Sequence, residues 1–154
     1  MVNSGSDKPT RLLASQFASH TIGLIGQYVR LLDLSIEELA IVILVYAEST
    51  RPIREDPYLA ARFGYEVRSL PNEYRPAVNL KYIYTSLGLS RETTRRKLEG
   101  LVGRGFLTKT ECGYVFHQPR PGHELSREFR SALTSFIKDV TALISRPTAE
   151  IAEG

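Results

Sequence analysis

The clearest chemistry in this sequence lies in a short basic stretch, residues 90–103. At about 100° per residue, these residues form a helix whose apolar face holds Thr94, Leu98, Leu101 and Val102. The opposite face is polar and has cations on both sides of it, an arrangement that suits a groove walled by phosphates. The pattern therefore predicts a helix that binds DNA.

The exposed face of this helix centres on Glu92, Arg96 and Gly103, with Thr93 nearby. Two cations flank that centre and are expected to contact phosphates: Arg95 and Lys97. Arg91 lies at the N-terminal tip, next to a good N-cap residue, Ser90.

The surrounding segments predict the order helix, turn, helix, hairpin. Residues 80–87 form the first helix, and Gly88 allows the positive φ of a tight turn. Two short strands, 106–110 and 114–117, follow the basic helix, and Lys109 near their turn is expected to contact a phosphate. This order is typical of a winged helix-turn-helix.

The segment Leu89-Ser-Arg-Glu-Thr-Thr-Arg-Arg-Lys-Leu98 resembles the recognition helix of the Crp/Fnr family, whose motif is Ser-Arg-Glu-Thr-x-x-Arg. The likeness covers roughly residues 78–117. It implies base contacts for Arg91, Glu92 and Arg96. It implies phosphate-contacting or capping roles for Ser90 and Thr93. The preceding residues look helical and are too few for that family's β-roll and long dimer helix, so cyclic-nucleotide binding is not implied. In architecture, the flanking helices resemble MarR-type dimeric regulators.

The same helix has a second interpretation. Glu92–Arg96 and Arg95–Glu99 are i,i+4 pairs, which also occur on any solvated helix face. A winged helix can also be a protein-interaction or chromosome-associated module, because fold does not fix function. Binding to duplex DNA that weakens with salt would separate these alternatives.

Positive charge is concentrated around the basic helix. Residues 79–120 contain eight Lys and Arg and three Asp and Glu, a net charge of +5, whereas the whole chain of 154 residues carries +3. Such an asymmetry favours a polyanionic partner. The hydrophobic content of 42% with 24% charged residues is that of a globular protein.

The chain is predicted to be mainly α with a small β-hairpin: a winged helix-turn-helix with N- and C-terminal dimerisation helices. Its segments are expected to be a disordered tail (1–9), an N-terminal helix (10–34), the winged domain (35–120) with an insertion (51–78), and a C-terminal helix and tail (121–154). Ser35 and Glu38 form the capping box of a buried helix that opens the winged domain.

The terminal helices are predicted to form a homodimer that reads inverted half-sites. In the N-terminal helix, apolar residues recur from Leu13 to Leu31 at helical spacing, with His20 packed among them. The C-terminal helix, from Ser126 to about Ser145, has a heptad seam whose steps are 4, 3, 4 and 3. The residues expected in the dimer interface are Phe129, Leu133, Phe136, Val140 and Leu143.

The insertion 51–78 contains four prolines and is expected to have little structure beyond one or two helical turns at 57–63, stopped by Gly64. It could form part of an effector pocket, a partner surface or an extra DNA contact. It could also be a loop that covers the edge of the core with Tyr58, Phe63, Tyr65 and Leu70.

Catalytic and metal chemistry find no support in the sequence. The three histidines, His20, His117 and His123, have no ligand spacing with Cys112, and no phosphate loop, nucleophile elbow or dinucleotide fingerprint is present. We therefore expect no enzyme activity, metal or cofactor. The single cysteine, the polar N-terminus and the shortness of the apolar run 39–47 predict a cytoplasmic protein. The operator, the sign of regulation and any small-molecule effector stay open.

Overall fold

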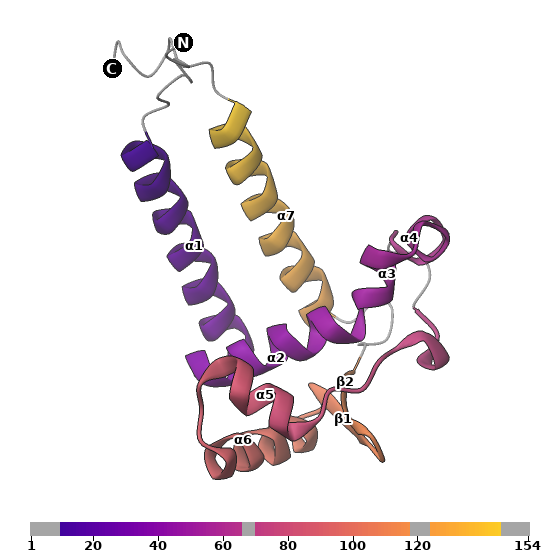
Figure 1. The fold of residues 1–154 in the computed structure, drawn as a ribbon. Helices are drawn as coiled ribbons and strands as arrows, with labels where there is room; N and C mark the ends of the chain where they lie inside the picture. Colours follow the sequence, from indigo (N-terminus) through magenta and orange to yellow (C-terminus); the bar gives the residue numbers. More distant parts are fainter. Residues whose placement is uncertain (1–9, 66–69, 118–123, 146–154) are drawn as a thin grey trace, which may run out of the picture. The chain divides into compact units, whose positions relative to one another are not determined.

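A computed structural model describes residues 10–65, 70–117 and 124–145 (Figure 1). The fold is mainly helical with a small antiparallel hairpin, as predicted. The chain divides into two compact units. One comprises residues 34–120, and the other combines the terminal segments 1–33 and 121–154.

The unit 34–120 is built around one helix, α2. Its elements, in chain order, are α2 (Ile36–Ser49), α3 (Arg51–Glu55), α4 (Pro57–Phe63), the 3-10 turn η1 (Asn72–Tyr74), α5 (Leu80–Leu87), α6 (Arg91–Gly103), β1 (Leu107–Thr110) and β2 (Gly113–Phe116). Helix α2 packs against α5, α6 and β2. Buried apolar side chains come from α2, α4, α5, α6, both strands and the segments around Leu70 and Val78: Leu39, Ile41, Val42, Val45, Leu59, Leu70, Val78, Ile83, Leu98, Leu101, Leu107 and Tyr114.

Helix α2 begins with the predicted capping box. The Glu38 N–H donates to Ser35 Oγ at 3.2 Å, and the Ser35 N–H donates to Glu38 Oε2 at 2.8 Å. The expectation that α2 is buried on all sides is wrong, because Ile43 keeps 45% and Tyr46 39% of its surface exposed. Only the side of α2 that faces α5, α6 and β2 is covered within this unit.

Helix α5 has the predicted bounds, α6 begins one residue after the predicted start at residue 90, and the turn between them has the predicted chemistry. Gly88 caps α5 at φ 65°, in the left-handed region that glycine adopts without penalty. Its N–H and that of Leu89 both reach the Tyr84 carbonyl. Ser90 then caps α6, and Gly105, at φ 82°, follows the end of that helix.

The hairpin β1–β2 pairs Leu107 with Phe116 and Thr110 with Gly113, so Glu111 and Cys112 form its turn. Val78 adds a short edge to β2 that the sequence did not predict, through two backbone hydrogen bonds with Tyr114 at 2.8 and 2.9 Å.

Gly113 is required where Val78 approaches the hairpin. Its φ is 144°, and a Cβ at this position would lie 2.3 Å from the Val78 carbonyl oxygen. Any side chain here would push the two segments apart.

The segment 51–78 is more structured than predicted. Pro52 lies in the first turn of α3, where its missing N–H costs nothing, and Asp56 caps α4 by accepting from the Tyr58 N–H at 2.8 Å. Gly64 follows the end of α4, as predicted.

The burial within this segment differs from the prediction in part. Leu70 is buried as expected, but Tyr58 and Tyr65 are 62% and 76% exposed. Leu59 faces the core instead, because adjacent residues of a helix point about 100° apart.

The terminal unit is an antiparallel pair of helices, α1 (Thr10–Leu32) and α7 (Glu124–Ser145) (Figure 1). Helix α1 begins where predicted but ends at Leu32, two residues before the expected end at residue 34, and α7 begins two residues earlier than predicted. The rings of Phe17 and Phe136 lie 6.4 Å apart between centroids. His20 is not a packing residue: its ring is 41% exposed, with Nδ1 3.6 Å from the Asp139 carboxylate.

The predicted heptad seam of α7 is used in part within the chain. Leu143 is buried, and it lines a hollow with Val140 and two residues of α1, Leu13 and Phe17. The side chain of Phe129 lies outside the described residues. Other apolar side chains of these two helices remain more than 40% exposed: Leu12, Phe17, Ile22, Ile137 and Ile144.

Candidate nucleic-acid interface

The buried face of α6 fixes which side chains that helix presents to a partner. Leu98 and Leu101 enter the core, and Thr94 is fully buried with its hydroxyl donating to the Ser90 carbonyl at 2.8 Å. Val102 is only half-buried, although the sequence predicted burial. With this face anchored against α2 and α5, the opposite face of α6 is open.

Arg91 and Arg96 are exposed cations of α6. In the described part of the chain, no carboxylate lies within ion-pair distance of either guanidinium. Both forks of donors are therefore available to a ligand, and a guanidinium fork matches the O6 and N7 acceptors of guanine or two phosphate oxygens.

Glu92, Arg95 and Glu99 form an ion-pair network along α6. Arg95 donates to both oxygens of Glu92, at 2.7 and 3.1 Å, and also pairs with Glu99. The hydrogen bonds from Arg95 lower the pKa of the Glu92 carboxyl, and the nearby charges of Arg95, Arg96 and Arg91 lower it further. The same contacts raise the pKa of Arg95.

This network changes the balance among the predicted site residues. The sequence suggested a Glu92–Arg96 pair, but Glu92 pairs with Arg95 instead. Both oxygens of Glu92 are already hydrogen-bonded, so the freest groups for reading base edges are those of Arg91 and Arg96. Arg95 can reach a phosphate only by sharing or leaving its carboxylates.

Ser90 and Thr93 act together as the N-terminal cap of α6. Ser90 Oγ accepts from the Thr93 N–H at 3.0 Å and donates to Thr93 Oγ1 at 2.7 Å. Of the two roles that the family resemblance implies for these residues, capping is the one visible in the folded chain.

Lys97 is tied to the start of α2. Its Nζ lies 3.1 Å from Glu37 Oε2 and 3.4 Å from Ser35 Oγ, and only 23% of its side chain is exposed. A phosphate contact by Lys97 therefore requires that a phosphate oxygen replace the Glu37 carboxylate. The sequence did not predict the Lys97–Glu37 pair, because the two residues are 60 positions apart.

Lys109 is exposed on β1, one residue before the end of the strand. In the described structure no acidic side chain pairs with it. Arg104, which follows α6, lies over the ring of Phe106 with its guanidinium carbon 5.1 Å from the ring centroid. The hairpin thus places one cation near its tip and another beside its base.

Two glycines on the exposed side of α6 were not fully recognised from the sequence. A Cβ at Gly100 or Gly103 would have nothing within 4 Å, so neither position is glycine for packing reasons. Gly100 is interior to the helix, where glycine is less stable than alanine by about 0.5–1 kcal/mol. Missing side chains let another surface approach the helix backbone closely.

Other kinds of site were sought in the same described residues. No group of three or more His, Cys, Asp or Glu there is placed to hold a metal ion. None of the described helices is both long and apolar enough to cross a membrane. Cys112 is an exposed free thiol in the hairpin turn.

Comparison with known proteins gives this chain no relative. No protein-family model, curated protein or solved structure matches it.

Proposed function

We propose that this protein is a sequence-specific regulator of transcription that binds duplex DNA. Residues 34–120 then form a winged helix-turn-helix, with α5 and α6 as the two helices and the β1–β2 hairpin as the wing. The observation that carries this proposal is the open face of α6, where Arg91 and Arg96 are exposed and unpaired opposite a fully buried anchor.

Three further features support DNA as the partner. The α5–α6 turn is tight and left-handed at Gly88, and α6 packs against both α5 and α2, so its orientation in the unit is fixed. Gly100 and Gly103 have no side chains, so a groove wall could approach the backbone of α6 closely on its exposed side. Helix α6, at 1.5 Å per residue, is about 20 Å long, enough to cross a major groove. Lys109 lies on the wing, where a neighbouring phosphate would be met.

The terminal helices support a homodimer as the functional form. Helices α1 and α7 leave several apolar side chains exposed, among them Ile22, Ile137 and Ile144, each of them more than half exposed. Patches of this kind are rarely left to water. A two-fold dimer would present two copies of α6 to half-sites about 34 Å apart.

A protein-interaction module is the second candidate, and one observation favours it. The Glu92–Arg95–Glu99 network neutralises part of α6, which a phosphate-binding face does not need. In that case α6 binds a protein surface and shows no base preference.

Two measurements test the proposal. Selection of bound fragments from a random duplex library should return an inverted repeat, and binding to it should weaken steeply with salt. On the selected site, Arg96→Ala should lose about 1–3 kcal/mol and relax the choice at one base pair. Equal weakening on selected and random DNA would contradict base reading, and no DNA binding at low salt would favour the second candidate.

A further inference from the structure

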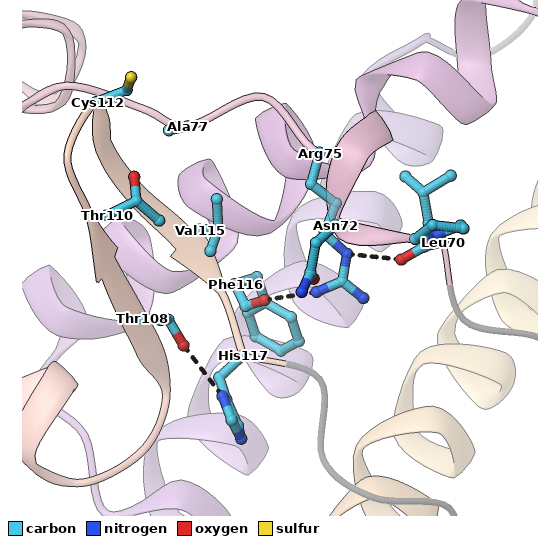
Figure 2. A pocket seen from close by; sticks show the side chains of 11 residues that line it. Leu70, Asn72, Arg75, Ala77, Thr108, Thr110, Cys112, Val115, Phe116 and His117 are labelled. Atoms are coloured by element: carbon cyan, nitrogen blue, oxygen red, sulfur yellow. Dashed lines mark hydrogen bonds between the residues drawn. The ribbon is translucent and has the colours of Figure 1, made fainter.

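A cavity of about 840 Å³ lies in the unit 34–120, away from the recognition face of α6 (Figure 2). Its floor is the face of the hairpin that carries Thr108, Thr110 and Val115. The segment that leads into and out of η1 supplies the opposite wall. The cavity is of the size that small-molecule sites have, about 300–1,000 Å³.

Arg75 is the charged group of this cavity. Its side chain is half-buried, and its Nε donates to the Leu70 carbonyl at 2.9 Å while Nη1 donates to the Phe116 carbonyl at 3.3 Å (Figure 2). Burial lowers the pKa of this guanidinium. The two carbonyls fix the plane of the guanidinium but carry no charge.

Arg75 lacks the anion that a half-buried arginine normally has. Within the described residues, no carboxylate lies within ion-pair distance of it and no acceptor is bonded to its Nη2. A partly desolvated charge without a counter-charge is unfavourable, and an anion in the cavity would relieve it. By contrast, Arg51 and Arg95 form ion pairs and lie on exposed helix surfaces, with 46% and 45% of their side chains exposed.

The remaining walls favour an anion with an apolar body. Ala77, Val115 and Leu70 are apolar, and the Phe116 ring is held edge-on against Tyr46, 5.0 Å between centroids. Thr108 Oγ1 lies 3.1 Å from His117 Nδ1, so these two polar groups satisfy each other (Figure 2). One guanidinium among apolar walls balances a single negative charge.

We propose that this cavity binds a small organic carboxylate, with the carboxylate on Arg75 and an apolar, flat body against Val115 and Ala77. The site goes beyond DNA recognition and does not depend on it, because no residue of α6 lines it. A dianion such as phosphate is disfavoured, since Arg75 is the one Lys or Arg among the described residues that line the cavity.

The chain has its own reporter for this site. Cys112 is its only cysteine, it is exposed, and it lines the cavity. The rate at which N-ethylmaleimide alkylates Cys112 in the full-length protein should fall saturably as benzoate is added at constant ionic strength. For a ligand of nine heavy atoms we expect a dissociation constant on the order of 1 mM. Benzamide, the neutral isostere, should bind at least ten-fold more weakly, on the order expected for loss of a charge-assisted pair.

Matched variants decide the outcome. Arg75→Met should abolish protection of Cys112 by benzoate. Arg54→Met is the matched control, because Arg54 also donates to a backbone carbonyl, that of Ala47 at 2.7 Å. It should leave the protection unchanged, because Arg54 lies outside the cavity. If Arg75→Met disturbs the fold, Thr108→Trp decides instead, because the indole fills the cavity from an exposed strand position and leaves Arg75 intact. Equal protection by benzamide or phosphate, or protection that survives Thr108→Trp, would overturn the proposal.

Discussion

Release of Lys97 from Glu37 is the sharpest test of the proposal that α6 binds DNA. In the free protein, Lys97 Nζ is 3.1 Å from the Glu37 carboxylate, with 23% of the Lys97 side chain and 51% of the Glu37 side chain exposed. If Lys97 contacts a phosphate in the complex, it must give up this pair on binding. Glu37→Gln should therefore strengthen DNA binding.

The size of the effect follows from the exposure of the pair. Partly exposed ion pairs contribute about 0.5–1 kcal/mol, and removing that cost from the binding equilibrium corresponds to roughly a two- to five-fold gain in affinity. The same substitution should lower the free energy of unfolding by about 1 kcal/mol, because Glu37 also lies in the favourable first turn of α2. Stability and affinity thus move in opposite directions.

The assay is a double-mutant cycle measured by fluorescence anisotropy on the selected DNA site, over a series of salt concentrations. It compares wild type, Glu37→Gln, Lys97→Ala and the double variant. Lys97→Ala should flatten the slope of log affinity against log salt by about one unit. In the Lys97→Ala background, the gain from Glu37→Gln should largely vanish.

The control separates a specific exchange from a general change in charge. Glu48→Gln removes the same charge from the other end of α2, where Glu48 pairs with Arg51 at 3.5 Å. It should leave affinity within about two-fold of wild type. An equal gain from Glu37→Gln with and without Lys97, or an unchanged slope in Lys97→Ala, would refute the exchange and remove Lys97 from the interface.

Three other predictions concern assembly and backbone. Ile137→Glu, at a position that is 54% exposed, should yield a monomer that keeps its helix content, whereas Phe136→Glu should also loosen α1 from α7, because Phe136 contacts Phe17. Sedimentation measures the oligomeric state of each variant, and circular dichroism measures its helix content. A dimeric Ile137→Glu protein would exclude this face from the interface. Gly88→Ala should lower the free energy of unfolding, measured in urea, by about 1–2 kcal/mol, and Gly113→Ala should lower it more, because only at Gly113 would the added Cβ meet a backbone oxygen. Equal losses of stability would contradict the close approach of Val78 to Gly113. Gly100→Ala should stabilise the protein by about 0.5–1 kcal/mol, and Gly100→Leu should weaken DNA binding at least ten-fold; unchanged binding by Gly100→Leu would place the glycine outside the interface.

The local elements could be predicted from the sequence because their causes lie within a few residues. The Ser35–Glu38 capping box links residues three apart, and the turn at Gly88 depends on one residue's freedom at positive φ. The bounds of α5 and α6 follow from such signals together with apolar periodicity. The sequence therefore determined these helices, their turn, the hairpin and the buried face of α6 apart from Val102, which is half-buried.

The long-range partners of Lys97 and Arg75 were decided by tertiary structure. Lys97 was assigned to phosphates from its place on a helical wheel, but only the packing of α6 on α2 brings Glu37 to it. Arg75 likewise reads as one more charge in a loop until the fold places the Phe116 carbonyl, 41 residues away, beside it. Contacts between residues so far apart in the sequence produce no periodic pattern, because each depends on how two separately formed elements pack against one another. The burial of Leu59 in place of Tyr58, which was predicted to cover the core, has the same cause. Both side chains are apolar enough for a core, and the orientation in which α4 packs determines which of them is buried.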